Sequence, residues 1–243
     1  MMEYFALTDI GSYRDKNQDA YYAGTNLEGD FLGVVCDGIG GGRAGEVASN
    51  KAIEYIEKNF PTSGNFDNFD EVKEYAVYLV KKASEYVYDL SVTNYDYFGM
   101  GTTITGVFIS KYGTLTINIG DSRVYGIKKK KIKQLTDDDS LVNEMLKNGE
   151  ISSEEAKNHP KKHCILKAIG LYASVEPKIE VCSGYDYYIV CSDGVHGFVP
   201  DSKMLEVVSN KDDSLEDKCH ELLSLSLLAG GYDNITVVLV SCR

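Results

Sequence analysis

The chain has 243 residues, of which 43% are hydrophobic and 26% charged, and its formal net charge at pH 7 is -12. This composition is typical of a globular domain, and the acidic balance argues against nucleic acid as the main partner. No apolar stretch reaches about 18 residues and the N-terminal sequence lacks the pattern of a signal peptide, so we expect no membrane span and a cytoplasmic protein.

Apolar runs rich in Val, Ile, Tyr and Phe and bounded by Gly, Ser and Asn predict buried strands, whereas apolar residues at helical spacing predict helices. In chain order, the pattern predicts strands at 3–9, 18–24 and 31–37, helices at 44–60 and 68–93, a connection at 94–101, and strands at 102–110, 113–120, 123–128 and 131–135. It continues with a polar helical segment at 140–162, strands at 175–182 and 186–192, helices at 201–209 and 214–229, and a strand at 235–240.

Short gaps between consecutive strands indicate antiparallel hairpins, and the helices come in pairs between the strand groups. This order predicts an α+β layered sandwich. We see no linker, internal repeat or low-complexity tract, so we expect a single domain over residues 1–243.

Five of the apolar runs stop on, or start from, an aspartate. One Asp-Gly or Asp-Ser pair at a strand end is usually a turn. Several carboxylates at one sheet edge would repel one another unless cations lie between them, and hard divalent cations prefer such oxygen ligands. The pattern therefore predicts a multi-metal hydrolytic site for Mg²⁺ or Mn²⁺. The five residues are Asp9, Asp37, Asp121, Asp193 and Asp233.

The segment VVCDGIGGGRAGEVAS also allows a different hypothesis. Gly40, Gly42 and Gly45 have the G-x-G-x-x-G spacing of a dinucleotide-binding turn. Two features disfavour it: Asp37 would repel the pyrophosphate, and a second helix follows the first where the motif requires a strand that ends in an acid.

The segment TDIGSYRDKNQDA supplies a cation among the acids. Arg14 lies midway between Asp9 and Asp19 in a predicted loop. Its guanidinium either forms a salt bridge or binds a phosphate group with two parallel hydrogen bonds.

The ordered motifs resemble a known family along essentially the whole chain. They are TDIGSYRDKNQD, VCDGIGGGRAGEVAS, MGTTITGVFI, NIGDSRVYGI, QLTDDDSLVNEMLKNGEISSEEAKNHP, CSDGVHGFV and GGYDNITVV. Together they resemble the metal-dependent Ser/Thr protein phosphatases (protein phosphatase 2C-like) in their compact bacterial form. The resemblance implies a four-layer αββα sandwich of two antiparallel sheets flanked by helix pairs, with a helical flap at about 140–162 beside the substrate groove.

The resemblance also implies roles for the site residues. Two or three divalent cations, Mn²⁺ or Mg²⁺, would be bound, and Arg14 would bind the substrate phosphate. In the resemblance, Asp37 bridges two metals, Asp193 and Asp233 bind the first, and the Gly38 carbonyl binds the second. Asp121 and Asp193 would form a weaker third site. Asp19 and Gln18 would hold metal-bound water and would not bind a metal directly.

The implied activity is hydrolysis of phosphoserine and phosphothreonine in proteins by a hydroxide that bridges two metals. It would oppose a Ser/Thr protein kinase in bacterial signalling. We expect a monomer that acts on phosphorylated proteins and binds no nucleic acid and no membrane. A second class, a metal-binding regulatory module without turnover, stays open.

Several positions depart from the family pattern. Gln18 replaces a frequent Glu, Gly42 and Arg43 stand where a His often follows the glycines, and other replacements fall at Asp139, His163 and Lys167. None removes an implied metal ligand, but the usual proton donors for the leaving group are missing. The donor is then metal-bound water or His196, and we favour a packing role for His196.

Overall fold

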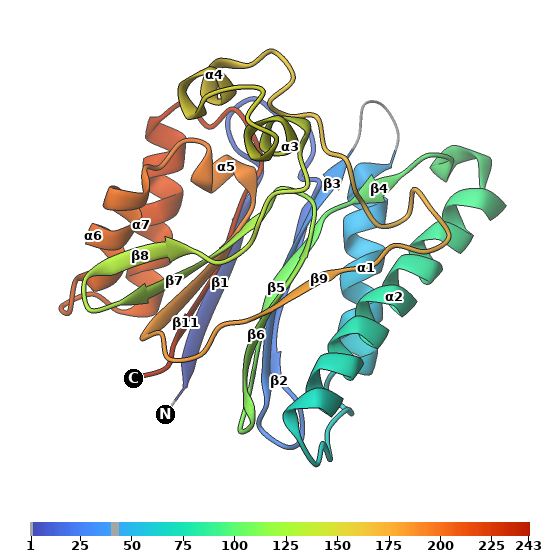
Figure 1. The fold of residues 1–243 in the computed structure, drawn as a ribbon, viewed down its shortest axis with the longest axis horizontal. Helices are drawn as coiled ribbons and strands as arrows, with labels where there is room; N and C mark the ends of the chain where they lie inside the picture. Colours follow the sequence, from blue (N-terminus) through green and yellow to red (C-terminus); the bar gives the residue numbers. More distant parts are fainter. Residues whose placement is uncertain (1, 40–43) are drawn as a thin grey trace.

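The computed structural model describes residues 2–39 and 44–243 of the chain (Figure 1). In this part of the chain, two antiparallel sheets lie face to face, with α1 and α2 outside one sheet and α5, α6 and α7 outside the other. The predicted four-layer α+β sandwich is therefore confirmed.

The first sheet contains both the N-terminal and the C-terminal strand. Its antiparallel order in the described residues is β1 (Glu3–Asp9), β11 (Ile235–Ser241), β10 (Tyr187–Cys191), β7 (Arg123–Lys128) and β8 (Lys131–Gln134). Asp9 pairs with Ile235, so the loop after β1 and the segment before β11 meet at one end of the sandwich.

The second sheet places two of the predicted site residues opposite each other, because Asp19 pairs with Asp37 across β2 and β3. Both faces of β3 are covered, which explains its almost unbroken run of buried residues. The strand order in the described residues is β2 (Asp19–Thr25), β3 (Phe31–Ile39), β5 (Ile104–Ser110), β6 (Gly113–Ile119) and β9 (Lys178–Val181), with β4 (Gly101–Thr102) paired to β3.

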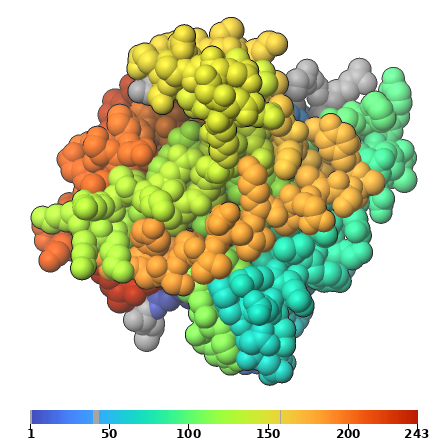
Figure 2. All heavy atoms as spheres, viewed as in Figure 1, coloured from blue at the N-terminus to red at the C-terminus, as the bar shows by residue number. Residues whose placement is uncertain are grey.

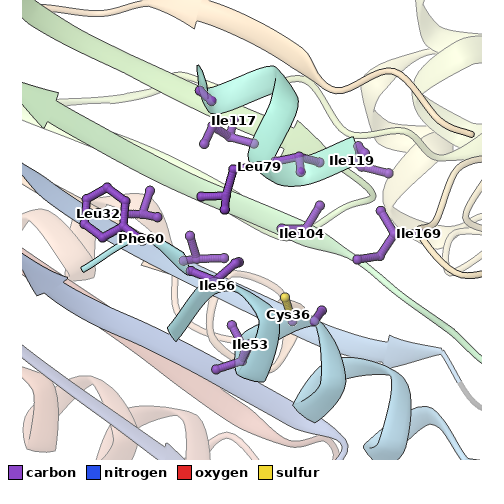
Figure 3. Packing of buried hydrophobic residues seen from close by; sticks show 14 of the residues in the cluster. Leu32, Cys36, Ile53, Ile56, Phe60, Leu79, Ile104, Ile117, Ile119 and Ile169 are labelled. Atoms are coloured by element: carbon purple, nitrogen blue, oxygen red, sulfur yellow. The ribbon is translucent and has the colours of Figure 1, made fainter. Parts of the chain in front are cut away.

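The helices bury apolar stripes against the outer faces of the sheets. On the second sheet, α1 (Gly45–Asn59) and α2 (Phe69–Thr93) pack over a core that includes Leu32, Ile56 and Ile117 (Figure 3). A short 3₁₀ helix, η1 (Tyr95–Tyr97), follows α2.

On the first sheet, α5 (Asp193–His196), α6 (Asp201–Ser209) and α7 (Leu215–Leu228) cover a second apolar cluster. A third cluster, with Phe31, Tyr188 and Val240, fills the space between the sheets. None of the helices in residues 2–39 and 44–243 has both the length and the apolar character that a membrane crossing requires.

The predicted helical flap consists of α3 (Leu141–Lys147) and α4 (Ser153–Asn158), which lie at the end of the sandwich shown at the top of Figures 1 and 2. Ser152 caps α4, since its hydroxyl accepts a hydrogen bond from Glu155 N while the Glu155 side chain accepts one from Ser152 N. These two reciprocal hydrogen bonds form a capping box at the start of α4.

Most element boundaries lie within two residues of the prediction, and three elements differ from it more clearly. The strand expected at 102–110 is divided, because Thr103 leaves the strand pairing to bond the backbone of Asp37. The strand expected at 175–182 is restricted to β9, and the one-turn helix α5, which begins at Asp193, was not predicted. A four-residue helix is too short to show a helical hydrophobic period.

Candidate active site

Five aspartates from separate elements surround one end of the sandwich. Asp37 lies near the end of β3, Asp19 begins β2, Asp121 follows β6, Asp193 begins α5 and Asp233 precedes β11. Burial raises the pKa of Asp37 well above its ordinary value, and the charges of the other four carboxylates raise it further. The fold therefore gathers the implied ligands into one acidic cluster.

Asp9 has a different role, although the sequence places it at a strand end like the others. Its Oδ1 accepts a hydrogen bond from Gly11 N at 2.8 Å. This contact closes a local turn at the end of β1, which is the common function of an Asp two residues before a Gly.

The backbone of Asp37 is fixed by two threonines of the β4–β5 segment. Asp37 N donates to Thr103 Oγ1 at 2.9 Å, and Thr103 N donates to Asp37 O at 2.9 Å. Thr102 Oγ1 also donates to Asp37 O, at 2.8 Å. The break between β4 and β5 thus anchors the central carboxylate of the cluster.

Gly38 and Gly45 let two backbones approach closely. A Cβ at Gly38 would lie 2.3 Å from Gly45 O, and one at Gly45 would lie 2.9 Å from Gly38 O. Gly38 N also donates to Gln18 O at 3.0 Å. Any side chain at Gly38 would force β3 and the first turn of α1 apart and displace the Gly38 carbonyl.

The dinucleotide-binding alternative is wrong. Its motif belongs to a parallel sheet, whereas β3 pairs antiparallel with both β2 and β5. Gly45 serves the close backbone contact described above, while Gly40 and Gly42 lie outside the described residues.

Asp19 is 5% exposed and connects the two sheets. Its Oδ2 accepts hydrogen bonds from Ser192 Oγ and Thr236 Oγ1, both at 2.7 Å. Burial raises the pKa of Asp19 to about 7, and the two hydroxyl bonds limit that rise. The carboxylate is therefore held in one orientation beside the cluster.

Asn234 was missed by the sequence analysis, although it follows Asp233 directly. Its Oδ1 accepts from Gln18 N at 2.8 Å, and its Nδ2 donates to Ile10 O and Lys16 O at 2.8 and 3.0 Å. One buried amide thus holds the whole loop that carries Arg14 and leads into Asp19.

Asp121 and Asp193 each have a carboxylate oxygen that is buried without a protein hydrogen-bond partner among the described residues. Burial raises the pKa of Asp121 to about 7. Burial also opposes ionisation of Asp193, but His163, His196 and Arg14 together hold its pKa below the ordinary value. A buried oxygen without a hydrogen-bond partner lowers the stability of the folded protein unless a ligand satisfies it.

The donor set fits hard divalent cations. Carboxylate oxygens and a glycine carbonyl are the ligands that Mg²⁺ and Mn²⁺ prefer. No group of three or more His, Cys, Asp or Glu side chains within residues 2–39 and 44–243 forms a ready-made cage for one ion.

Arg14 lies at the mouth of the cluster. Its Nη2 donates to Asp233 Oδ2 at 2.7 Å, while 46% of the Arg14 side chain stays exposed. The hydrogen bond to Asp233 raises the pKa of Arg14, with support from the charges of Asp193 and Asp37. The salt bridge considered from the sequence is present, and nearly half of the Arg14 side chain remains exposed.

A pocket of about 590 Å³ lies between the acidic cluster and the flap. Asp121, Asp193 and Asp233 form part of its wall, and the remaining wall is partly apolar. The apolar contributors are Val142 and Leu146 of α3, Ala156 of α4 and Phe198 after α5.

The base of the flap is joined to the sheet by a pair that the sequence analysis missed. Arg123 of β7 contacts Asp138 through Nε at 3.0 Å and Nη2 at 2.8 Å. Asn143 Nδ2 in α3 donates to Asp138 O at 2.7 Å. Beside them, buried Asp139 pairs with Lys178 of β9 at 2.5 Å and accepts a hydrogen bond from Gly120 N at 3.3 Å.

Two histidines approach the cluster from different sides. His163, which follows the flap, places Nδ1 3.7 Å from Asp193 Oδ2 and remains largely exposed. His196 Nε2 lies 3.0 Å from Asp121 O, and burial lowers the pKa of His196 to about 4. The ring is therefore neutral at pH 7 and donates its N–H to the Asp121 carbonyl.

Replacing His196 by Ala is expected to slow hydrolysis of phosphopeptides and of p-nitrophenyl phosphate by similar, small factors. The substitution removes a hydrogen bond that supports the Asp121 turn, which is worth about 1 kcal/mol. Steady-state kinetics on both substrates check this. A defect confined to phosphopeptides, whose leaving group needs a proton, would identify His196 as the acid instead.

Comparison with known proteins agrees with this geometry. Residues 13–224 match the family model described as Protein phosphatase 2C. The chain belongs to the protein phosphatase 2C family. The protein phosphatase PhpP of Streptococcus pneumoniae is 35% identical, with 99% of this chain and 97% of PhpP covered.

Solved structures of the family superpose closely on this fold. The serine/threonine phosphatase of S. agalactiae has a TM-score of 0.93 at 34% identity, with 100% of both chains covered. The catalytic domain of PstP in complex with two manganese ions has a TM-score of 0.85 at 30% identity, covering 99% of this chain and 97% of that one. The chain is thus a protein serine/threonine phosphatase of the 2C family.

Proposed function

We propose that the acidic cluster binds two or three divalent cations, Mn²⁺ or Mg²⁺, and that the protein hydrolyses phosphoserine and phosphothreonine in proteins with their help. The observation that carries the proposal is the pair of buried, unpartnered carboxylate oxygens on Asp121 and Asp193. The manganese in the related PstP domain supports the same donor chemistry.

The proposed ligands come from both sheets. Asp37 and the Gly38 carbonyl come from β3. Asp193 begins α5, Asp233 precedes β11, and Asp121 lies between β6 and β7. Asp19 and Gln18 lie next to these ligands. Asp19 pairs with Asp37 across β2 and β3, and Gln18 O accepts a hydrogen bond from Gly38 N. When bound, the cations supply charge neutralisation and lower the pKa of a coordinated water.

The chain's own groups position the reaction. Arg14 contacts Asp233, which lines the pocket, and we propose that its planar guanidinium binds two phosphoryl oxygens of the substrate. Asp233 keeps the guanidinium oriented toward the cluster through their 2.7 Å contact. The flap borders the pocket on the other side, where Val142 and Leu146 of α3 form part of its wall.

We propose further that residues 1–243 act as one catalytic domain, as a monomer, and oppose a Ser/Thr kinase. Hydrolysis of a phosphate ester restores the hydroxyl group that a kinase has modified. The three core clusters fill continuous layers between the helices and the sheets, which supports a single folding unit.

Hydrolysis of matched peptides that differ only in phosphoserine, phosphothreonine or phosphotyrosine tests the function, with and without Mn²⁺. We expect Mn²⁺-dependent release of phosphate from the first two. A metal-binding regulatory module would bind Mn²⁺ in calorimetry but release no phosphate from any of the three.

The phosphate contact predicts a specific result for Arg14. Arg14→Ala is expected to raise KM for phosphopeptides about tenfold or more, because it removes a charged hydrogen bond to the phosphate. Arg14→Lys should restore only part of the affinity, since Lys lacks the planar fork. Steady-state kinetics distinguish this from a purely structural salt bridge, which would leave KM unchanged in both variants.

A further inference from the structure

A row of three aromatic rings, the exposed Tyr13 and Tyr232 and the half-buried Phe198, lies beside the catalytic cluster. Tyr13 is 68% and Tyr232 52% exposed. The ring centroids of Tyr13 and Tyr232 are 4.8 Å apart, and those of Tyr232 and Phe198 are 5.9 Å apart. Aromatic side chains left in contact with water at this density are typical of interaction surfaces.

The row is joined to the site at three points. Tyr13 precedes Arg14 and Tyr232 precedes Asp233, so the salt bridge between Arg14 and Asp233 lies next to the stacked tyrosines. Phe198 lines the pocket that also contains Asp233. The row therefore begins beside Arg14, the proposed phosphate contact, and is continuous with the catalytic pocket.

The backbone beneath the row is built to hold it. Ser12 N donates to Gly231 O at 2.7 Å, which ties the loop after β1 to the segment after α7. Gly230 has a positive φ of 130°, and a Cβ there would lie 2.1 Å from Tyr232 Cε2. Glycine at this position therefore allows the Tyr232 ring to lie against the main chain.

We infer that the row formed by Tyr13, Tyr232 and Phe198 binds the substrate polypeptide next to its phosphorylated residue and favours an apolar or aromatic side chain there. This inference rests on the proposed function. A phosphoprotein whose phosphate reaches the cluster must leave the site across its rim, and the row extends for about three residues of extended chain at roughly 3.4 Å each. Stacking on rings supplies affinity without a charge requirement.

Phosphothreonine peptides test the inference. Each has an Ala/Gly background with a single Phe at one position within three residues of the phosphothreonine, and a reference peptide has none. We expect the wild-type protein with Mn²⁺ to show a KM about tenfold lower for at least one Phe peptide than for the reference, the size of one good aromatic contact.

The double variant Tyr13→Ala/Tyr232→Ala should lose this preference through KM, with kcat and p-nitrophenyl phosphate hydrolysis unchanged. Tyr13→Phe/Tyr232→Phe should retain it, because the rings remain. Tyr78→Ala is the matched control, since Tyr78 is 54% exposed on α2, outside the pocket beside the cluster.

Retention of the preference in the double alanine variant would overturn the inference, as would an equal loss on p-nitrophenyl phosphate. A change in oligomeric state, measured by sedimentation velocity, in place of a change in KM would show that the row contacts a second copy of the chain. Equal KM values for all peptides in the wild type would reject the docking row alone, whereas no phosphopeptide hydrolysis at all would reject the proposed function as well.

Discussion

Asp37→Asn and Asp193→Asn are each expected to reduce kcat at least about 100-fold on phosphopeptides and on p-nitrophenyl phosphate. Each substitution keeps the size of the side chain and removes one negative charge from a proposed cation site, so Lewis-acid catalysis is weakened. Both substrates should be affected alike, because both depend on the same attack at phosphorus.

Asp37→Asn is expected to have a second effect, on thermal stability, in the direction opposite to its effect on kcat. Burial and the neighbouring carboxylates oppose ionisation of Asp37 in the folded protein without cations. Removing its charge should therefore leave the thermal stability of the cation-free protein equal to or above that of the wild type, measured by thermal denaturation in chelator. If the variant were inactive because it misfolds, its thermal stability in chelator would be lower than that of the wild type.

Asp9→Asn is the matched control, since Asp9 also ends a strand but accepts a local hydrogen bond from Gly11. An Asn side chain can accept the same bond, so we expect near-native kcat. If Asp37→Asn or Asp193→Asn retains near-native turnover at modest Mn²⁺, that residue is not a ligand.

Removing divalent cations is expected to reduce hydrolysis to background, and adding Mn²⁺ or Mg²⁺ to restore it. Measurement of phosphate release in chelator and after re-addition of each ion checks this. Full activity in excess chelator, with metal absence confirmed by elemental analysis, would contradict the proposed cation dependence.

Cation removal should also change the pH dependence of stability. Burial raises the folded-state pKa of Asp19 and of Asp121 to about 7, whereas an unfolded Asp has a pKa of about 3.9. Between these values the folded state binds more protons than the unfolded state, so the stability of the cation-free protein falls as pH rises from about 4 to 7. Mn²⁺ should raise the melting temperature most near pH 7, and an equal effect at pH 5 would contradict this.

The strand-end aspartates could be predicted because two local patterns coincide there. An apolar run followed by Asp-Gly or Asp-Ser indicates a buried strand and the approximate place where it ends, since β3 ends two residues after Asp37 and β10 ends two residues before Asp193. The antiparallel order also follows from short gaps between strands. Their convergence at one end of the sandwich then follows from the layered fold.

The supporting contacts could not be predicted, because they join residues far apart in the sequence. Ser192 and Thr236 bond Asp19 across separations of 173 and 217 residues. His163 reaches Asp193 only because the segment after α4 returns to the cluster. No local pattern records which hydroxyl or ring completes a contact of this kind.

The carboxylate of Asp19 links the two halves of the sandwich through hydrogen bonds. It belongs to β2, while Thr236 lies in β11 of the opposite sheet and Ser192 directly follows β10 of that sheet, so hydrogen bonds of 2.7 Å join the halves at this end. At the other end, Tyr188 Oη of the first sheet donates to Cys182 O beside the second at 2.7 Å, and side chains such as Phe31 and Val240 fill the space between the sheets. Since the Asp19 bonds lie at the end that carries the acidic cluster, the two halves are joined by hydrogen bonds at the place where their aspartates meet.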